Sequence, residues 1–352
     1  AIYFQEVTDK RWDIKDFMSW VGSDKPQTKF KYLLGAQGAD LSQYSESNLD
    51  IVYYPTHKIR VPVNKENVLA SGLVKAKDSA LIVDYIDIDL PKSALPKNRL
   101  LMLDLLANND WKRPLYFSGG SFEDGEYLWM KDYLQLDGLT YKLVPIKTKY
   151  ESVFEMGRID TDTMSEIVKS WEWGNSGDPD VYIDTQTRVQ GLSFRSNLAR
   201  LTETLIGENK LSEAKEILDI GMKNMPVKGF DYYNFVVPFI EGYYAVGAPE
   251  EARGIFLELK NIYQDHLTYY AAMDVSDQYN SIQNIIENLE GYRRILDVLS
   301  IGDRPEISEE ERREFELFMD KFSHFYEGAE AQNNPFESDN SIETIPLDSS
   351  LE

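Results

Sequence analysis

A change of hydrophobic period near residue 163 divides this sequence into two regions that are expected to differ in fold. Up to about residue 150, apolar residues fall in short runs, several of which alternate with polar residues as in strands. After residue 163 they recur at intervals of three and four residues, the spacing of amphipathic helices. The sequence therefore predicts an α+β or mixed α/β domain followed by an all-α domain.

The helical half contains two units of similar pattern. Ala214 and Ala252 stand 38 residues apart, each as the small residue of a second helix. The tetratricopeptide period is about 34 residues, and we assign the surplus to a loop at residues 227–231. One helix pair cannot bury its apolar face alone, so the pattern predicts tetratricopeptide-like pairs that stack. The matching positions are Leu198, Leu201, Leu205, Leu211, Leu218, Gly221 and Pro226 in the first unit, and Val236, Phe239, Tyr243, Gly247, Phe256 and Leu259 in the second.

Further helix signals set the domain boundaries. Thr163 with Glu166, and Ser308 with Glu311, fit capping boxes at helix starts. An apolar stripe over residues 282–299 predicts one of two capping helices. We predict a mixed α/β domain at 1–150, a helix and turn-rich connector at 151–184, tetratricopeptide-like helical repeats with capping helices at 185–327, and an acidic tail at 328–352.

The strand predictions of the first half rest on short runs bounded by proline and glycine. The clearest is 81–90, in which Ile86 and Ile88 share one face and Asp87 and Asp89 share the other. Pro62 would place the run 58–63 at a sheet edge or a bulge. Further strands are predicted at 2–4, 51–54, 141–146 and, as a buried strand, 115–118. A helix is predicted over 98–106, with Leu101, Leu105 and Leu106 among its apolar positions.

Composition excludes several classes of function. The formal net charge of −23 repels phosphate backbones and anionic lipid head groups, which argues against nucleic-acid partners. The absence of cysteine excludes disulfides, thiol catalysis and cysteine-based metal sites. The three histidines, His57, His266 and His324, are far apart in sequence, which argues against a metal site built from several histidines. The richest apolar stretch, at 100–106, is interrupted by Asp104 and is far shorter than a membrane span of about 20 residues.

The motifs contain no catalytic constellation. The glycines of residues 35–40 lack a complete phosphate-binding fingerprint and predict a turn. Asp87 and Asp89 either ligate a hard cation or face solvent as a charged strand face. Asp137 and Glu126 are a candidate acid–base pair whose separation the sequence does not fix. We therefore expect no catalytic residue, no metal site and no cofactor in this chain.

Aromatic residues are concentrated in two places. One is a cluster between residues 111 and 141, which either forms a platform for sugar rings or packs in the core. The other is a set of tyrosines in the helical half that would line a concave repeat surface suited to peptides or partner domains. The cluster comprises Trp111, Tyr116, Phe117, Phe122, Tyr127, Trp129, Tyr133 and Tyr141, and the tyrosines are Tyr232, Tyr233, Tyr243, Tyr244, Tyr269 and Tyr270.

Several blocks resemble one bacterial family. The pattern W-x-R-P-[IL]-Y-F begins at Trp111, and Y-[LF]-Q-L-[DE]-G-L begins at Tyr133. With their neighbours over about residues 40–300, these blocks resemble the soluble C-terminal tail of the domain-of-unknown-function 2723 family. Its members are multi-spanning membrane proteins that resemble GT-C protein O-mannosyltransferases and carry tetratricopeptide-like repeats. The residues that match the motifs are Trp111, Arg113, Pro114, Tyr116, Phe117, Tyr133, Gln135, Leu136, Asp137, Gly138 and Tyr141.

The resemblance implies a non-catalytic extracytoplasmic tail on the periplasmic side of the bacterial inner membrane. The membrane spans and the glycosyltransferase chemistry of such a parent protein lie N-terminal to these blocks. The abrupt start at Ala1, without a methionine, agrees with a segment of a longer chain. Such a tail would position acceptor or partner proteins, and a glycan is a further candidate ligand. The candidate binding residues are Trp111, Arg113, Tyr116, Tyr133, Gln135, Asp137, Tyr243 and Tyr244.

Two alternatives stay open at this point. One is a stand-alone repeat adaptor that binds peptides. The other is a soluble carbohydrate-active or carbohydrate-binding protein that uses the aromatic-rich α/β face. The triplets around Ser79 and Thr163 also resemble the short acceptor sites of some periplasmic O-glycosylation systems.

Overall fold

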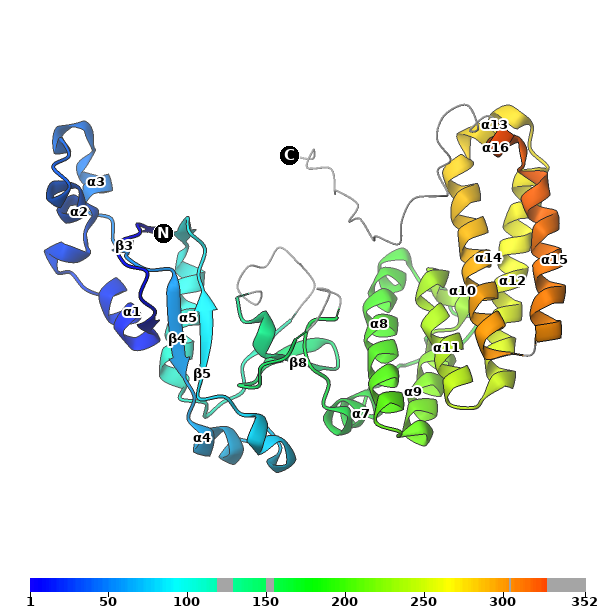
Figure 1. The fold of residues 1–352 in the computed structure, drawn as a ribbon, viewed down its shortest axis with the longest axis horizontal. Helices are drawn as coiled ribbons and strands as arrows, with labels where there is room; N and C mark the ends of the chain where they lie inside the picture. Colours follow the sequence, from blue (N-terminus) through cyan, green and yellow to red (C-terminus); the bar gives the residue numbers. More distant parts are fainter. Residues whose placement is uncertain (119–128, 150–154, 304, 328–352) are drawn as a thin grey trace. The chain divides into compact units, whose positions relative to one another are not determined.

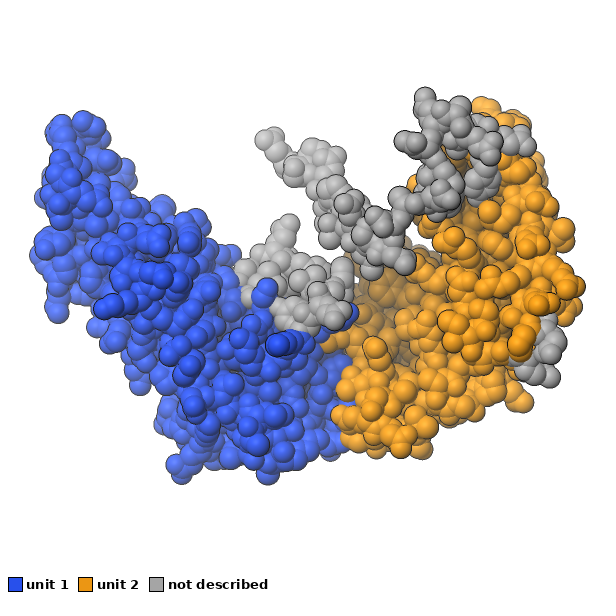
Figure 2. All heavy atoms as spheres, in the orientation of Figure 1, with its two compact units in different colours: residues 1–172 blue, residues 173–352 orange. Residues whose placement is uncertain are grey.

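The chain forms two compact units, Ala1–Glu172 and Trp173–Glu352 (Figure 2). The computed structural model describes residues 1–118, 129–149, 155–303 and 305–327. The division between the units falls inside the segment predicted as a connector. Unit 1 mixes helices with small sheets and unit 2 is helical (Figure 1), as the change of period predicts.

Unit 1 builds its described strands into three sheets of three strands each, ordered β3-β1-β6, β2-β4-β5 and β7-β9-β8. The strands are β1 (Ile2–Phe4), β2 (Trp12–Asp13), β3 (Tyr53–Tyr54), β4 (Lys58–Pro62), β5 (Tyr85–Asp89), β6 (Ala94–Leu95), β7 (Tyr116–Phe117), β8 (Leu134–Asp137) and β9 (Thr140–Leu143). The helices and 3-10 turns are α1 (Ile14–Val21), η1 (Pro26–Thr28), α2 (Phe30–Ala36), η2 (Leu41–Gln43), α3 (Glu46–Leu49), α4 (Lys65–Ala70), η3 (Ala76–Leu81), α5 (Lys97–Asn109), η4 (Lys131–Tyr133) and α7 (Thr161–Lys169).

The predicted alternation of apolar and polar residues is seen in the β4–β5 pair, whose apolar side chains point into the core. Ile86 and Ile88 of β5 are fully buried and lie opposite Val61 and Ile59 of antiparallel β4. The prediction that Pro62 marks an edge strand is wrong, since β4 is the middle strand of its sheet. Pro62 is tolerated because β2 pairs only with Ile59 and Arg60, which leaves the last residue of β4 with a partner on one side alone.

Two other expectations for unit 1 are corrected by the structure. Helix α5 buries Leu106 as predicted, together with Leu103 and Ala107, but the prediction is wrong for Leu101 and Leu105, which are more than half exposed. The run 115–118 is not a buried strand. Its β7 segment is a two-residue strand that, among the strands the structure describes, pairs with β9 alone, and Tyr116 is 51% exposed.

The β8–β9 hairpin, which was not predicted, turns at Gly138 and Leu139. Gly138 has φ +67°, and glycine at the first central position of a two-residue loop is the signature of a type II′ turn. A Cβ on Gly138 would also lie 2.9 Å from the Ile167 side chain on α7. Both constraints explain why glycine follows Asp137 in this motif.

Unit 2 consists of helices joined by short connections. They are α8 (Thr185–Gly207), α9 (Leu211–Asn224), α10 (Val227–Phe230), η6 (Tyr233–Phe235), α11 (Val237–Ala245), α12 (Pro249–Ala271), α13 (Val275–Asn280), α14 (Ile282–Gly302), α15 (Pro305–Lys321) and α16 (His324–Glu327). Helix α8 packs on α9, α11 on α12, α12 on α14 and α14 on α15 (Figure 1).

The predicted small residues of unit 2 do allow close helix packing. Ala214 and Ala252 are fully buried. A Cβ on Gly221 would lie only 2.5 Å from the Phe239 ring, so α9 and α11 approach at a point where only glycine fits. Residues 227–231 are not a plain loop as predicted, because 227–230 form α10, which buries Val227 and Phe230.

Both proposed capping boxes are misplaced. Helix α7 begins at Thr161 and its N-cap is Asp160, whose side chain accepts from the Thr163 amide. Helix α15 begins at Pro305, so Ser308 lies inside the first turn and donates to the Pro305 carbonyl. In each case the Ser or Thr of the apparent box follows the true start by two or three residues.

Candidate functional site

A row of polar side chains crosses the β7-β9-β8 sheet. The strand register places Lys142 of β9 between Tyr116 of β7 and Gln135 of β8. Asp137 lies two residues beyond Gln135, on the same face of β8. Gln135, Asp137 and Lys142 are all buried, so among these four side chains Tyr116 alone is open to solvent.

Asp137 is the centre of this polar cluster. Its carboxylate lies 2.8 Å from the Lys142 ammonium and accepts a hydrogen bond of 2.8 Å from the Gln135 side chain. The Tyr116 hydroxyl donates to the second carboxylate oxygen at 3.4 Å. Burial, followed by the negative charge of Asp137, raises the pKa of Tyr116. The Asp137 carboxylate thus interacts with one side chain from each of the three strands of the sheet, and these contacts hold the strands together.

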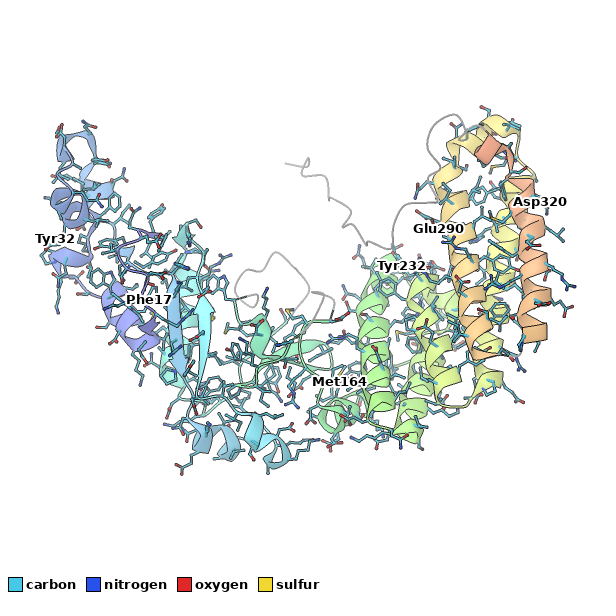
Figure 3. All side chains as sticks on the ribbon, viewed as in Figure 1. Phe17, Tyr32, Met164, Tyr232, Glu290 and Asp320 are labelled. Atoms are coloured by element: carbon cyan, nitrogen blue, oxygen red, sulfur yellow. The ribbon has the colours of Figure 1, made fainter. Side chains whose placement is uncertain are left out.

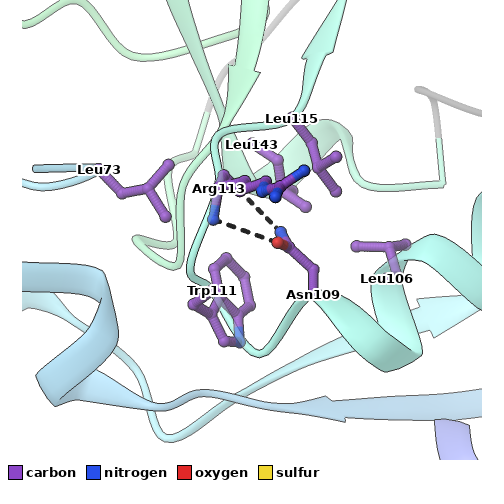
Figure 4. A pocket seen from close by; sticks show the side chains of 7 residues that line it. All are labelled: Leu73, Leu106, Asn109, Trp111, Arg113, Leu115 and Leu143. Carbon is purple, nitrogen blue, oxygen red and sulfur yellow. Dashed lines mark hydrogen bonds between the residues drawn. The ribbon is translucent and has the colours of Figure 1, made fainter. Parts of the chain in front are cut away.

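The W-x-R-P block contributes its tryptophan, Trp111, to the hydrophobic core of unit 1. The Trp111 ring is buried and its indole N–H donates to the Pro62 carbonyl at 2.8 Å. Asn109 exchanges two hydrogen bonds with the Arg113 backbone, drawn as dashed lines in Figure 4. The cavity between these residues is about 10 Å³, room for one water and too small for a sugar ring. The Arg113 side chain is exposed and makes no hydrogen bond or ion pair with any described residue.

The aromatic cluster is mainly core, so the core-packing interpretation is confirmed for five of its six described members. Trp111 and Tyr133 belong to the hydrophobic core, and Phe117, Trp129 and Tyr141 pack against it. Tyr116 remains the exposed exception. Phe122, Tyr127 and the candidate acid Glu126 lie outside the described residues.

Tyr243 and Tyr244, two of the six tyrosines predicted to line a repeat surface, donate hydrogen bonds to carboxylates. Tyr243 is 3% exposed and donates to Asp219 at 2.9 Å, and burial with this bond raises its pKa. Tyr244 donates to Asp303, which also pairs with Arg253. Tyr232, labelled in Figure 3, and Tyr269 are the more exposed members of the predicted set, at 40% and 64%. A binding role for Tyr243 and Tyr244 stays a prediction.

The carboxylates considered for a cation bind arginines instead. Asp87 receives two hydrogen bonds from Arg60 at 2.8 and 3.0 Å, and Asp89 receives one from Arg11 at 2.9 Å. The side-chain bond from Arg60, despite some burial, lowers the pKa of Asp87. Within the described ranges no group of three or more potential metal-ligating side chains occurs.

Asp160 is a buried carboxylate at the start of α7. It is 5% exposed and lies 3.2 Å from the Lys75 ammonium and 3.5 Å from that of Lys77. Burial opposes its ionisation, but hydrogen bonds from Thr163 and Lys75 outweigh burial and hold the pKa of Asp160 well below its ordinary value. Thr163 is therefore part of a cap.

We expect Asp160→Asn to lower the free energy of unfolding by about 1–2 kcal/mol at pH 7, because asparagine keeps the cap but loses both ion pairs. A carboxylate with a lowered native pKa stabilises the fold above the unfolded pKa, and that stabilisation fades as pH falls below about 4. Urea unfolding at pH 7 and pH 3 should show the difference between the proteins shrinking at pH 3. Asp184→Asn, at the exposed cap of α8, serves as control and should change little. A constant difference at both pH values would contradict the assignment.

Sequence reasoning missed two larger cavities. The first, of about 370 Å³, is lined in unit 1 by Trp12, Asp16, Ser19, Trp20, Ser23, Lys25, Gln27 and Thr28. The second, of about 480 Å³, is lined in unit 2 by the segment 176–183 except Gly177, with Arg188, Pro226, Lys228, Gly229 and Glu258. The signal for the first was available, since Asp16, Ser19 and Trp20 share one face of α1 and Ser23 follows the end of that helix.

The fold and these sites define a chain with a mixed α/β unit and a helical unit. Residues 1–163 match the family model described as TMEM260-associated domain 2, which marks this region as a domain associated with a membrane protein family. No curated protein and no solved structure gives a match. None of the helices that the structure describes is both long enough and apolar enough to span a bilayer.

Proposed function

We propose that this chain is the extracytoplasmic tail of a membrane glycosyltransferase-like protein, and that unit 2 positions acceptor or partner proteins for it. The observation that carries the proposal is the match of residues 1–163 to a TMEM260-associated domain. The blocks at Trp111 and Tyr133, on which the likeness to protein O-mannosyltransferase-like membrane proteins rests, lie within this region. The tail would stand on the periplasmic side of the bacterial inner membrane.

Unit 2 supports a tetratricopeptide-like arrangement. The small residues Ala214 and Ala252 occupy equivalent places in the pairs α8–α9 and α11–α12, and both are fully buried. Gly221 and Gly242 bring α9 and α11 close to their neighbours. Stacked helix pairs of this kind leave an extended surface for a partner chain.

The cavity of about 480 Å³ beside segment 176–183 is a candidate site for such a partner. Tyr182, on its wall, is 80% exposed, which makes it the most exposed tyrosine of the described residues. Pro179, Pro226 and Gly229 supply apolar and backbone surface, while Lys228 and Glu258 supply opposite charges. A site of this composition suits an extended peptide segment with mixed charge.

The test uses the parent protein in its own cells. Removing residues 185–330 should reduce modification of acceptor proteins while the membrane level of the parent stays unchanged. Tyr182→Ser should reduce modification in the same direction, whereas Tyr32→Ser, an exposed tyrosine in unit 1, should not. Full modification after the deletion would refute the positioning role.

A further inference from the structure

The cavity of about 370 Å³ in unit 1 is built from three consecutive segments. Trp12 comes from β2, Asp16, Ser19 and Trp20 from α1, and Lys25 and Gln27 from the turn that leads into and forms η1. The opposite face of α1 buries Ile14 and Phe17, the latter labelled in Figure 3. The amphipathic helix therefore fixes which side chains face the cavity.

The two tryptophan rings are held in place before any ligand arrives. The Trp20 indole N–H donates to the Tyr53 carbonyl at 2.7 Å. The ring centroids of Trp12 and Trp20 are 5.5 Å apart, with an interplanar angle of 72°. The ring centroids of Trp20 and Tyr53 are 5.7 Å apart, with an interplanar angle of 76°. Rings already ordered lose little conformational entropy when a ligand packs on them.

The turn at residues 23–28, which forms the wall opposite the tryptophans, is also held by hydrogen bonds, while three polar side chains of the cavity remain available to a ligand. The Thr28 hydroxyl donates to the Ser23 and Lys25 carbonyls, both at 2.9 Å, which braces the turn. Among the described residues, the side chains of Asp16, Ser19 and Gln27 have neither hydrogen-bond nor ion-pair partners. Together they offer donors and acceptors beside aromatic surface.

We propose that this cavity binds one neutral pyranose residue of a glycan, reversibly and without covalent change. A pyranose has an apolar C–H face that can pack on a tryptophan ring and hydroxyls that can pair with Asp16, Ser19 and Gln27. Lys25 disfavours a cationic ligand and Asp16 an anionic one, so a neutral ligand suits the charges best. The volume lies at the small end of the range of about 300–1,000 Å³ for small-molecule sites. This inference is independent of the proposed function, because its test uses the chain alone in solution.

The test titrates the full 352-residue chain with the methyl glycosides of mannose, glucose, galactose and N-acetylglucosamine. Tryptophan fluorescence and saturation-transfer NMR report the binding. At least one glycoside should saturate the protein with a dissociation constant of about 1 mM, because a single ring offers few contacts. Asp16→Asn should weaken that binding about tenfold, through loss of a charged hydrogen bond.

The controls separate the site from general effects. Asp265→Asn changes an exposed carboxylate on α12 and should leave the affinity unaltered. Trp12→Ala should abolish binding, and because Asp16 is exposed, its variant tests the proposal even if Trp12→Ala fails to fold. The proposal is overturned if no glycoside binds saturably, if Asp16→Asn and Asp265→Asn behave alike, or if choline or glycine binds in preference to every glycoside.

Discussion

Replacing Arg195 with alanine should lower the free energy of unfolding of unit 2 by about 3–5 kcal/mol. Arg195 is 1% exposed and donates to the carbonyls of Met225, Pro226 and Asp231, where α9 passes into α10 and η6. Burial lowers the pKa of Arg195 to about 10, so the side chain is still a cation at pH 7. Without it, three carbonyls lose a charged donor and the interior loses a large side chain.

Hydrogen exchange of the amides in residues 225–231 measures this effect within the intact chain. The matched control is Arg293→Ala, since Arg293 is exposed on α14 and pairs with no described residue, so a change below about 0.5 kcal/mol is expected. If the two variants exchange at the same rate, Arg195 does not hold the inter-helix segment.

The second large effect concerns the buried pair of Asp137 and Lys142. Asp137→Ala should cost about 3–5 kcal/mol, because it leaves the Lys142 ammonium buried without its partner. The double variant Asp137→Leu with Lys142→Met should recover part of this loss, since an apolar pair of similar volume has no charge to desolvate, although the buried Gln135 amide still loses its acceptor. Urea unfolding of the double variant and of the single variants Asp137→Leu and Lys142→Met gives the coupling free energy between the two sites.

An exposed ion pair of equal length serves as control for that cycle. Lys65 and Asp84 are also 2.8 Å apart, but their side chains are 49% and 81% exposed. Lys65→Ala should therefore cost no more than about 1 kcal/mol. Equal losses for Lys65→Ala and Asp137→Ala would show that burial does not decide the value of the Asp137–Lys142 pair.

How much of this fold the sequence predicts depends on how local the signal is. The β5 alternation and the helical period of unit 2 are local. The helices form after the change of period, and β5 forms within the predicted run 81–90, although it begins only at Tyr85 because residues 76–81 form η3. The role of Pro62 and the burial pattern of α5 depend on which distant segments pack on them. The residues around Pro62 do not show that its neighbour β2 is only two residues long. The residues around Leu101 do not show which side of α5 faces solvent.

The candidate sites follow the same rule. The motif residues Trp111, Gln135 and Asp137 were found, but their roles required contacts to Pro62 and Lys142 from other strands. The Trp12–Trp20 cavity was missed because its wall combines a strand, a helix and a 3-10 turn, none of which carries a motif. The misplaced cap at Thr163 has a simpler cause, since Asp160 three residues earlier is an equally good cap.

The central proposal is that this chain is part of a larger membrane protein, and fractionation of its own cells tests that proposal most directly. An antibody raised against the chain should detect, in the inner-membrane fraction, a band much heavier than the 40.6 kDa of these 352 residues. A soluble band near 40.6 kDa, with none in the membrane, would contradict it.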